Sequence, residues 1–451
     1  MFPLLLLVIA SFDIVHGAKI LVASMPQGRS HTGSFMALIN KLKNDGHQVF
    51  LYMEAYPDEM NFGLEDRILR IKNHTNPFAD DKFQTFLWQD DYGVTDQRLP
   101  FFYGAGSCET VLKEHRDHFN QMVEEKFDLI LTDTLFAACA YGIATLNQAH
   151  HVLMSSTHIE SATGSMRAYG INFVLTPRHY MPVDDTEFKP SYFRYRLAST
   201  LEWIENFVIN GIIVGERMKI ALAPVVSSFC FFEYHKTASA TLTDMPTDLI
   251  GPFPRTNDVS GTVINWGQIP KSQFEAVLRT LSSLTDYRIV WAYNGKEMEM
   301  KSHIYASKWV PQVDVLFDNR TVLFFSHGGL KSVKEATCSS VPSIFMPMFA
   351  EQGYGEVFSK HNLTTENLTA VMKRVLENKR FSSNAARMTM LFNDKVIHPL
   401  KHGVHYVNRL LKYGGRMPEF FYPCAITRDY LSYLNLDIFI IPLIIVIGIS
   451  Y

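Results

Sequence analysis

Histidines, carboxylates and glycines gather in this chain where apolar strands give way to helices. The stretch Trp309–Gln352 contains W-V-P-Q, then V-L-F-F-S-H-G-G-L-K-S-V-K-E, then I-F-M-P-M-F-A-E-Q. Val322–Ser326 is an apolar run typical of a parallel strand covered on both faces. The H-G-G turn that follows predicts a sharp entry into a helix beginning near Leu330. Because the first N–H groups of a helix favour an anion, this stretch indicates phosphate binding.

The three motifs W-x-P-Q, H-G-G-x-x-S-x-x-E and P-x-x-x-E-Q resemble the donor-binding signature of the UDP-glycosyltransferases, especially the membrane-bound UDP-glucuronosyltransferase-like group. The chain is similar to a shortened member of that group. The resemblance implies an α/β fold of the GT-B type, in which two Rossmann-like, doubly wound domains face a cleft. It also implies contacts with the base, ribose, diphosphate and sugar of a UDP-sugar, made by Trp309, Gln312, His327, Gly328, Gly329, Ser332, Glu335, Glu351 and Gln352.

Sugar transfer to an alcohol also needs a base, and a histidine suits that task because its pKa lies near neutrality. His31 follows the first strand in the loop S-M-P-Q-G-R-S-H-T-G, where the resembled family has its catalytic histidine. Asp133 ends the apolar strand F-D-L-I-L-T-D, the position of the family's partner aspartate. Carboxyl ends of parallel strands meet at one edge of a sheet, so the two side chains can converge.

Several of these residues also have plain structural explanations. Asp133 could cap the following helix, and His31 could be one of the 17 histidines on the surface. Trp309 could be a core residue, and Glu335 could lie on a solvated helix face beside lysines. Lys331 stands where the family usually has Asn or Gly.

Alternating apolar strands and amphipathic helices predict two domains in the 451 residues. We expect a signal peptide at 1–17, an acceptor-binding domain at 18–243, a linker at 244–259, a UDP-sugar-binding domain at 260–415 and a short or truncated transmembrane segment at 436–451. Within these domains the pattern predicts a helix over Glu109–Glu125 and a long apolar helix over Leu197–Ala223.

Composition excludes several classes of protein. A hydrophobic share of 47% with 19% charged residues indicates a packed globular protein. A net charge of -3 without a basic cluster argues against a nucleic-acid partner. The five cysteines include no C-x-x-C motif, so neither a metal site nor a redox site is indicated. Because their number is odd, disulfide formation within the chain would leave at least one free thiol. We expect no metal and no cofactor beyond the UDP-sugar co-substrate.

Both ends of the chain bear on its location. The run Leu4–Ala10 predicts a secretory signal, or alternatively a buried first strand. Leu436–Tyr451 covers about 24 Å as a helix, short of the roughly 30 Å bilayer core. We therefore expect a glycoprotein of the endoplasmic reticulum membrane with lumenal catalytic domains, or a lumenal or secreted soluble protein if this tail does not anchor it. Asn73, Asn362 and Asn367 begin glycosylation sequons.

The predicted activity is inverting transfer of glucuronate or another hexose from UDP to a small lipophilic acceptor, as in detoxification. Segments near 250–270 and 353–362 are shorter than the resembled family's, which leaves alternatives open. One is a catalytically impaired paralogue that binds ligands or pairs with active family members, as a homo- or hetero-oligomer. The other is a different GT-B enzyme, such as a lipid-carrier glycosyltransferase.

Overall fold

The computed structural model describes residues 17–24, 29–55, 66–70, 81–135, 137–155, 189, 191–243, 266–348, 356–422, 428 and 432. The predicted linker 244–259, the tail 436–451 and all but Gly17 of the predicted signal peptide lie outside these residues. Glu351 and Gln352 also lie outside them. Of His31 the structure describes the backbone.

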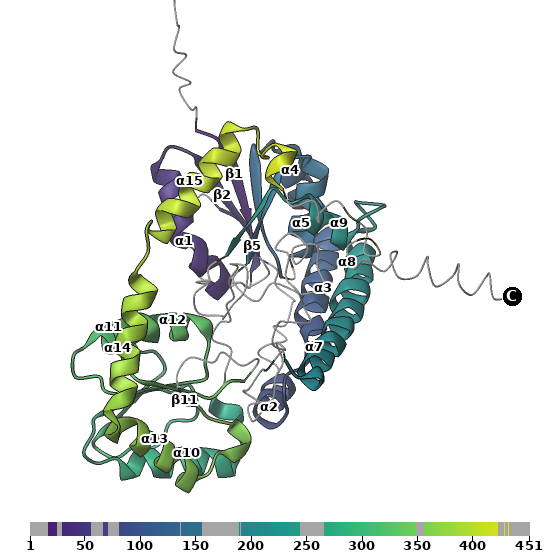
Figure 1. Ribbon diagram of the computed structural model, residues 1–451. Coiled ribbons are helices and arrows are strands. Elements are labelled where there is room, and N and C mark those ends of the chain that lie inside the picture. Colours follow the sequence, from purple (N-terminus) through teal and green to yellow (C-terminus); the bar gives the residue numbers. More distant parts are fainter. Residues whose placement is uncertain are drawn as a thin grey trace, which may run out of the picture.

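The first half of the chain builds a parallel six-stranded sheet in the order β3-β2-β1-β4-β5-β6 (Figure 1). Its strands are β1 (Lys19–Ala23), β2 (Gln48–Ala55), β3 (Asp66–Arg70), β4 (Leu129–Asp133), β5 (His151–Ser155) and β6 (Ala240–Thr243). Alternate residues of a strand face opposite sides of the sheet. Leu21 accordingly lies in the core on one face, and Ile20 and Val22 lie in the core on the other. The parallel order confirms the predicted doubly wound α/β class.

Helices cover both faces of this sheet. The helices of the first half, not all of which touch this sheet, are α1 (Arg29–Asn44), α2 (Asp81–Gln89), η2 (Val94–Gln97), α3 (Arg98–Glu114), α4 (Arg116–Glu124), α5 (Ala138–Asn147), α7 (Phe193–Asn206), η4 (Phe207–Ile213), α8 (Val214–Leu222) and α9 (Phe231–Thr237). The predicted single helix over Glu109–Glu125 is wrong, because the chain breaks at His115 between α3 and α4. The break lets Phe119 and Met122 of α4 join the core that α3 and α5 share. The predicted long helix over Leu197–Ala223 is confirmed as α7, η4 and α8 in succession.

The second half has shorter parallel strands, paired as β7-β8 and β11-β10-β9. Its elements are η6 (Trp266–Gln268), α10 (Lys271–Ser283), β7 (Ile289–Ala292), β8 (Ile304–Ser307), α11 (Gln312–Phe317), β9 (Phe324–Ser326), α12 (Leu330–Ser339), β10 (Ser343–Phe345), β11 (Glu356–Val357), η7 (Lys360–Asn362), α13 (Thr365–Glu377), α14 (Lys379–Asn393), α15 (Pro399–Lys412) and η8 (Glu419–Phe421). The expectation that Val322–Ser326 is buried on both faces is wrong. Val322 is exposed before the strand begins, and β9 pairs with β10 alone among the described strands.

Two helices cross between the halves. Trp88 of α2 is fully buried in a core formed with α10, α13 and the strands of the second half. In the other direction, Val404, Val407 and Leu410 of α15 lie in the core beside α1 and the first sheet. Figure 1 shows α15 lying over the first sheet and α2 beside the second half. The halves are therefore joined by packing as well as by the linker, and the predicted boundaries remain predictions.

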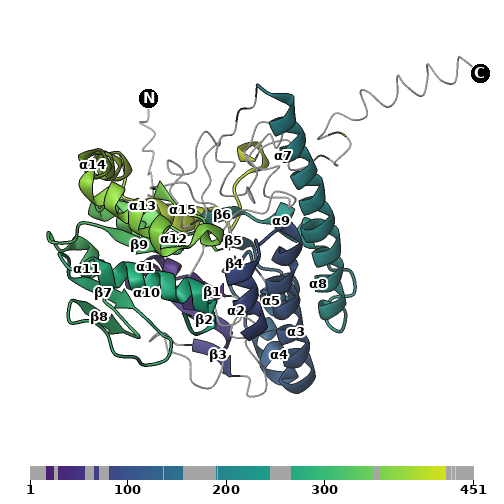
Figure 2. The same cartoon turned by 90° about the horizontal axis from the view of Figure 1, so that it is seen from below.

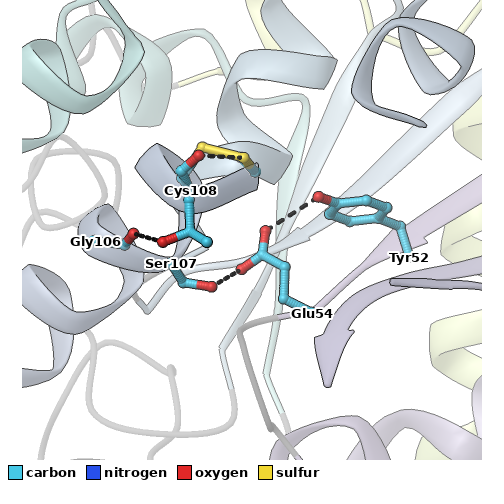
Figure 3. Close-up of a disulfide and its surroundings, with 7 residues drawn as sticks. Tyr52, Glu54, Gly106, Ser107 and Cys108 are labelled. Carbon is cyan, nitrogen blue, oxygen red and sulfur yellow. Dashed lines mark hydrogen bonds between the residues drawn. A yellow bond between two sulfur atoms is a disulfide. The ribbon is translucent and has the colours of Figure 1, made fainter. Parts of the chain in front are cut away.

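A disulfide joins Cys108 of α3 to Cys139 of α5, a pairing that the cysteine count left open. Beside it lies a buried carboxyl group (Figure 3). Glu54, near the end of β2, accepts hydrogen bonds from the Tyr52 hydroxyl at 3.1 Å and the Ser107 hydroxyl at 2.8 Å. Burial raises the pKa of Glu54 from 4.5 to about 7, and these two bonds oppose the shift.

This carboxyl group predicts a pH dependence of stability. The pKa of Glu54 is higher in the folded chain than in the unfolded chain. Its stabilising contribution to the free energy of unfolding is therefore fully present below pH 4.5 and is lost as the pH rises through about 7. We expect wild type to lose stability relative to Glu54→Gln as the pH rises. The unfolding free energy of wild type minus that of the variant should fall by about 3 kcal/mol from pH 4.5 to pH 8. Urea unfolding across this range measures it. The exposed Glu233→Gln is the control, and a difference that stays constant with pH would contradict the assignment.

Candidate functional site

The predicted phosphate-binding turn lies between β9 and α12. Gly328 has φ +76°, a left-handed conformation that favours glycine, and its N–H lies 3.4 Å from Oγ of Ser326. Gly329 is the N-cap of α12 and has no side chain with which to cap the helix. The sequence H-G-G therefore turns the chain sharply and leaves the first N–H groups of α12 to other partners.

His327 lies over this turn. An added Cβ at Gly329 would come within 2.5 Å of Nε2 of His327, so the ring occupies the space beside the helix start. Although part of the residue is accessible to solvent, Nε2 is buried and has no hydrogen-bond partner among the described residues. Burial lowers the pKa of His327 to about 4, so the ring is neutral at physiological pH. A buried nitrogen without a partner is costly, which marks this atom as one that a ligand could satisfy.

Three predicted donor-site side chains contact one another next to the turn. Nε2 of Gln312, the first residue of α11, lies 3.0 Å from Oγ of Ser332 and 2.5 Å from Oε2 of Glu335. Ser332 and Glu335 are three residues apart on α12 and so share a face of that helix. The amide thus holds a hydroxyl and a carboxylate in fixed positions. Such a pair can accept hydrogen bonds from a diol.

Trp309 lies just before α11 and is 72% exposed. The alternative that it is a core residue is therefore wrong. An exposed indole three residues from Gln312 is available to stack on a planar ring.

On the first sheet, Asp133 is buried at the carboxyl end of β4. Its Oδ1 accepts a hydrogen bond from the N–H of Leu135 at 2.9 Å, and its backbone carbonyl accepts one from the Tyr141 hydroxyl at 3.0 Å. The first bond organises the loop after β4. It does not cap α5, whose N-cap is Ala137.

The backbone of His31 lies in the first turn of α1, two residues after its start. The next residue, Thr32, is tied to the end of β1, because its Oγ1 lies 2.6 Å from Oγ of Ser24. β1 pairs with β4 in the register Ala23 to Thr132, which carries Ser24 to the level of Asp133. The turn of α1 that contains His31 is thus held at the sheet edge where Asp133 lies.

The starts of α1 and α12 meet. An added Cβ at Gly33 of α1 would lie 3.2 Å from Nζ of Lys331 of α12. Gly33 is two residues from His31, and Lys331 is four from His327. The structure therefore brings the predicted catalytic segment and the predicted diphosphate turn to one place. Figures 1 and 2 show α1 and α12 on neighbouring parts of the two halves.

Removal of the Gln312 amide is expected to weaken nucleotide binding. In Gln312→Ala, Ser332 and Glu335 lose the donor that aligns them, so we expect the Kd for UDP to rise about tenfold, or roughly 1.4 kcal/mol. Isothermal titration with UDP measures this. Gln273→Ala is the matched control, because Gln273 bonds to the backbone of Lys360 instead. Equal UDP affinities in the two variants would contradict the prediction.

Sequence reasoning missed two features around the site. Glu54 ends an apolar strand as Asp133 does, and that shared pattern was the available signal. Lys331 was noted as a departure from the motif, but its approach to Gly33 depends on how the two halves dock. Among the described residues, no three metal-ligating side chains gather.

The chain is similar in sequence to known sugar-transferring proteins. The family model described as "UDP-glucoronosyl and UDP-glucosyl transferase" matches residues 261–451. A human protein, UDP-glucuronosyltransferase 1A6, is 22% identical over 98% of this chain and 91% of its own length. A UDP-glycosyltransferase, UGT5, from Dactylopius coccus is 25% identical over 42% of this chain and 38% of its own length.

Solved structures of glycosyltransferases share the fold. One of VinC in complex with dTDP has a TM-score of 0.54 at 16% identity, covering 88% of this chain and 100% of that chain. Another, of Os79 from O. sativa in complex with UDP, has a TM-score of 0.53 at 15% identity, covering 86% and 99%. The predicted GT-B class is thereby confirmed.

Proposed function

We propose that this chain, whose residues 261–451 match the family model, is a UDP-glycosyltransferase that transfers glucuronate or another hexose from UDP to the hydroxyl of a small lipophilic acceptor, with inversion at the anomeric carbon. It is a glycosyltransferase enzyme that uses a UDP-sugar. The observation that carries the proposal is Nε2 of His327 before the start of α12, which is buried and has no hydrogen-bond partner among the described residues, together with the neighbouring Gln312, Ser332 and Glu335 group.

The donor half of the proposal assigns each group a task. His327 is neutral because burial lowers its pKa to about 4, so its ring can donate an N–H to the diphosphate without charge. The first N–H groups of α12 add further donors and the positive end of the helix dipole. Ser332 contributes a hydroxyl there, and Glu335 accepts from the ribose. Trp309, being exposed, stacks on the uracil.

Glu351 and Gln352 complete the proposed donor site by holding sugar hydroxyls, as the P-x-x-x-E-Q motif predicts. Charge on the departing diphosphate is stabilised by the helix start and by His327, so the proposed reaction requires no metal.

The reaction is a single displacement. His31 removes the proton from the acceptor hydroxyl as its oxygen attacks the anomeric carbon, and the bond from that carbon to the phosphate oxygen breaks. UDP leaves with the bonding electrons. An α-linked UDP-sugar then gives a β-linked product. The contact between Gly33 and Lys331 supports this scheme, because it brings the turn that carries His31 to the start of α12.

Asp133 is the proposed partner of His31. A carboxylate that accepts the other ring N–H selects the tautomer able to take a proton and stabilises the resulting imidazolium. Its burial at the end of β4, level with Ser24, supports that role. Because Oδ1 already accepts from Leu135, the loop after β4 holds the carboxylate in a fixed orientation.

A location at the endoplasmic reticulum membrane, with the catalytic domains in the lumen, is part of the proposal. The buried disulfide between Cys108 and Cys139 suits an oxidising compartment. Asn362 and Asn367, which begin two of the sequons, are both exposed.

A donor screen tests the function. The full chain is incubated with UDP-glucuronate, UDP-glucose or UDP-galactose and a panel of phenols, and released UDP is measured. We expect release with at least one donor, dependent on acceptor, and a β-linked product by NMR. UDP binding without turnover for any pair would favour the impaired paralogue instead. Failure to bind UDP at all would overturn the donor assignment.

A further inference from the structure

A row of polar side chains crosses the carboxyl edge of the first sheet. The registers of the parallel strands bring four residues to one level, namely Glu54 of β2, Thr134 at the end of β4, Ser155 of β5 and Thr243 of β6. We call these four residues the polar row. Their level is one residue beyond that of Asp133. The polar row therefore lies at the edge where open parallel sheets bind ligands.

The polar row faces the α3 side of the sheet. Two residues earlier in their strands stand Tyr52, in the core that contains α3 and α5, and Thr132, whose hydroxyl lies 2.9 Å from that of Tyr234 in the same core. Residues two apart in a strand face the same side. The N–H of Thr134 still bonds to a carbonyl of β5, so this alternation continues to the polar row. The polar row thus closes the top of the core beneath it.

Glu54 is the charged member of the polar row and is 5% exposed. Burial raises the pKa of Glu54, and hydrogen bonds from the hydroxyls of Ser107 and Tyr52 lower it (Figure 3). Among the described residues no basic side chain forms an ion pair with this carboxyl group. A buried carboxylate is costly unless a cation pairs with it. Two donors therefore prepare Glu54 for a negative charge, and the described part of the chain supplies no counterion.

Thr134 has a second incomplete contact. Its Oγ1 is buried and has no hydrogen-bond partner among the residues that the structure describes. Open space adjoins the polar row on α3, because a Cβ added at Gly106, next to Ser107, would meet no atom within 4 Å. An unpaired buried hydroxyl is costly, and a polar group of a ligand would satisfy it.

An ammonium group matches these contacts. It has three N–H donors and no acceptor, and both the Glu54 carboxylate and the Thr134 hydroxyl can accept from it. A neutral hydroxyl of a ligand would also bond to Thr134, but it would leave the carboxylate without a counter charge. An anionic group would be repelled by Glu54.

The polar row is also close to the segment that contains the proposed base. β2 pairs with β1, and neighbouring strands lie about 4.8 Å apart. At the end of β1, Ser24 holds Thr32 of α1, the residue after His31. A small ligand that lies across the end of β1 therefore reaches Glu54 at one end and the first turn of α1 at the other.

We propose that the polar row binds the ammonium group of the acceptor, so that the acceptors are phenols or alcohols with an amine on a short arm. Glu54 supplies the counter charge and accepts one N–H, and Thr134 accepts another. The reacting hydroxyl then lies at the first turn of α1. This inference rests on the proposed function, because it names the acceptor class for the same transfer.

Acceptor binding tests the proposal on the full chain with UDP present. Isothermal titration measures the Kd of tyramine, tyrosol and para-propylphenol, in which the same two-carbon arm ends in ammonium, hydroxyl or methyl. Glu54→Gln retains the shape of the side chain and removes its charge, and Thr134→Val removes the unpaired hydroxyl. Glu114→Gln, exposed at the end of α3, is the matched control. Circular dichroism checks the fold of each variant.

We expect wild type and Glu114→Gln to bind tyramine about tenfold more tightly than para-propylphenol, with tyrosol close to para-propylphenol. Glu54→Gln should reduce the tyramine preference to less than about twofold, and Thr134→Val to roughly threefold. If Glu54→Gln does not fold, the result for Thr134→Val decides.

Equal binding of tyramine and para-propylphenol to wild type would overturn the proposal, as would a tyramine preference that survives both substitutions. Tyrosol binding as tight as that of tyramine and dependent on Glu54 would overturn the ammonium assignment, because a neutral hydroxyl would then suffice. These Kd values are measured without turnover. Failure here is therefore distinguishable from failure of the proposed function, which the donor screen reports.

Discussion

His31→Ala is expected to lower kcat for sugar transfer by about 10²–10⁴-fold while leaving the Kd for UDP unchanged. General-base catalysis by a positioned histidine contributes an effect of this size. The variant removes the proposed base, whereas the donor contacts of Gln312, Ser332 and His327 lie on the other half of the chain. Initial rates at saturating donor and acceptor measure kcat, and titration with UDP measures binding.

The matched control is His405→Ala, since His405 is exposed on α15. Asp133→Asn is made alone and together with His31→Ala. When two residues act in one proton transfer, the fold losses of kcat in the single variants do not multiply in the double variant. We therefore expect the double variant to be about as slow as His31→Ala alone. Unchanged kcat in His31→Ala would remove it from the mechanism, and fully multiplicative losses would separate Asp133 from it.

Trp88→Ala is expected to destabilise the second half of the chain by about 3–5 kcal/mol. Trp88 belongs to the first half of the sequence, yet its side chain is fully buried in the second core, with its ring centroid 5.6 Å from that of Trp266. Truncation leaves a cavity and weakens the hold on α2, whose other anchors include the buried Lys360 ammonium, which donates to the carbonyls of Leu87 and Asp90. Denaturant unfolding followed by circular dichroism measures the loss.

Trp309→Ala is the control for that variant, because it removes the same side chain from an exposed position. We expect its unfolding midpoint to match that of wild type, while its Kd for UDP rises roughly tenfold through lost stacking on the base. Trp88→Ala should leave the UDP affinity of the remaining folded protein much closer to wild type. If both variants unfolded at the wild-type midpoint, α2 would not hold the two halves together.

Local sequence determined much of the donor half. The H-G-G turn, the helix beginning at Leu330 and the position of Glu335 on that helix follow from short-range rules of backbone conformation and periodicity. α13 (Thr365–Glu377) also has a local start signal, because the side chain of its N-cap Thr364 accepts a hydrogen bond from the N–H of Asn367. The strand before the turn is shorter than predicted, because an apolar run alone does not reveal where β9 begins or that, among the described strands, it pairs with β10 alone.

Contacts between distant segments were decided by the tertiary structure. The sequence motifs identified His31 and His327 independently of each other. That α1 and α12 approach each other at Gly33 and Lys331 depends on how the two halves of the chain pack together. The same holds for the burial of Trp88 in the second core and for the choice of Cys139 as partner of Cys108. Likewise, the sequence predicted an apolar helix over Leu197–Ala223, and only packing shows that Asn206 and Asn210 face inward while Leu197 and Leu201 are exposed. Periodicity defines the faces of a helix, whereas the choice of which face is buried rests on surfaces supplied by residues far away in the chain.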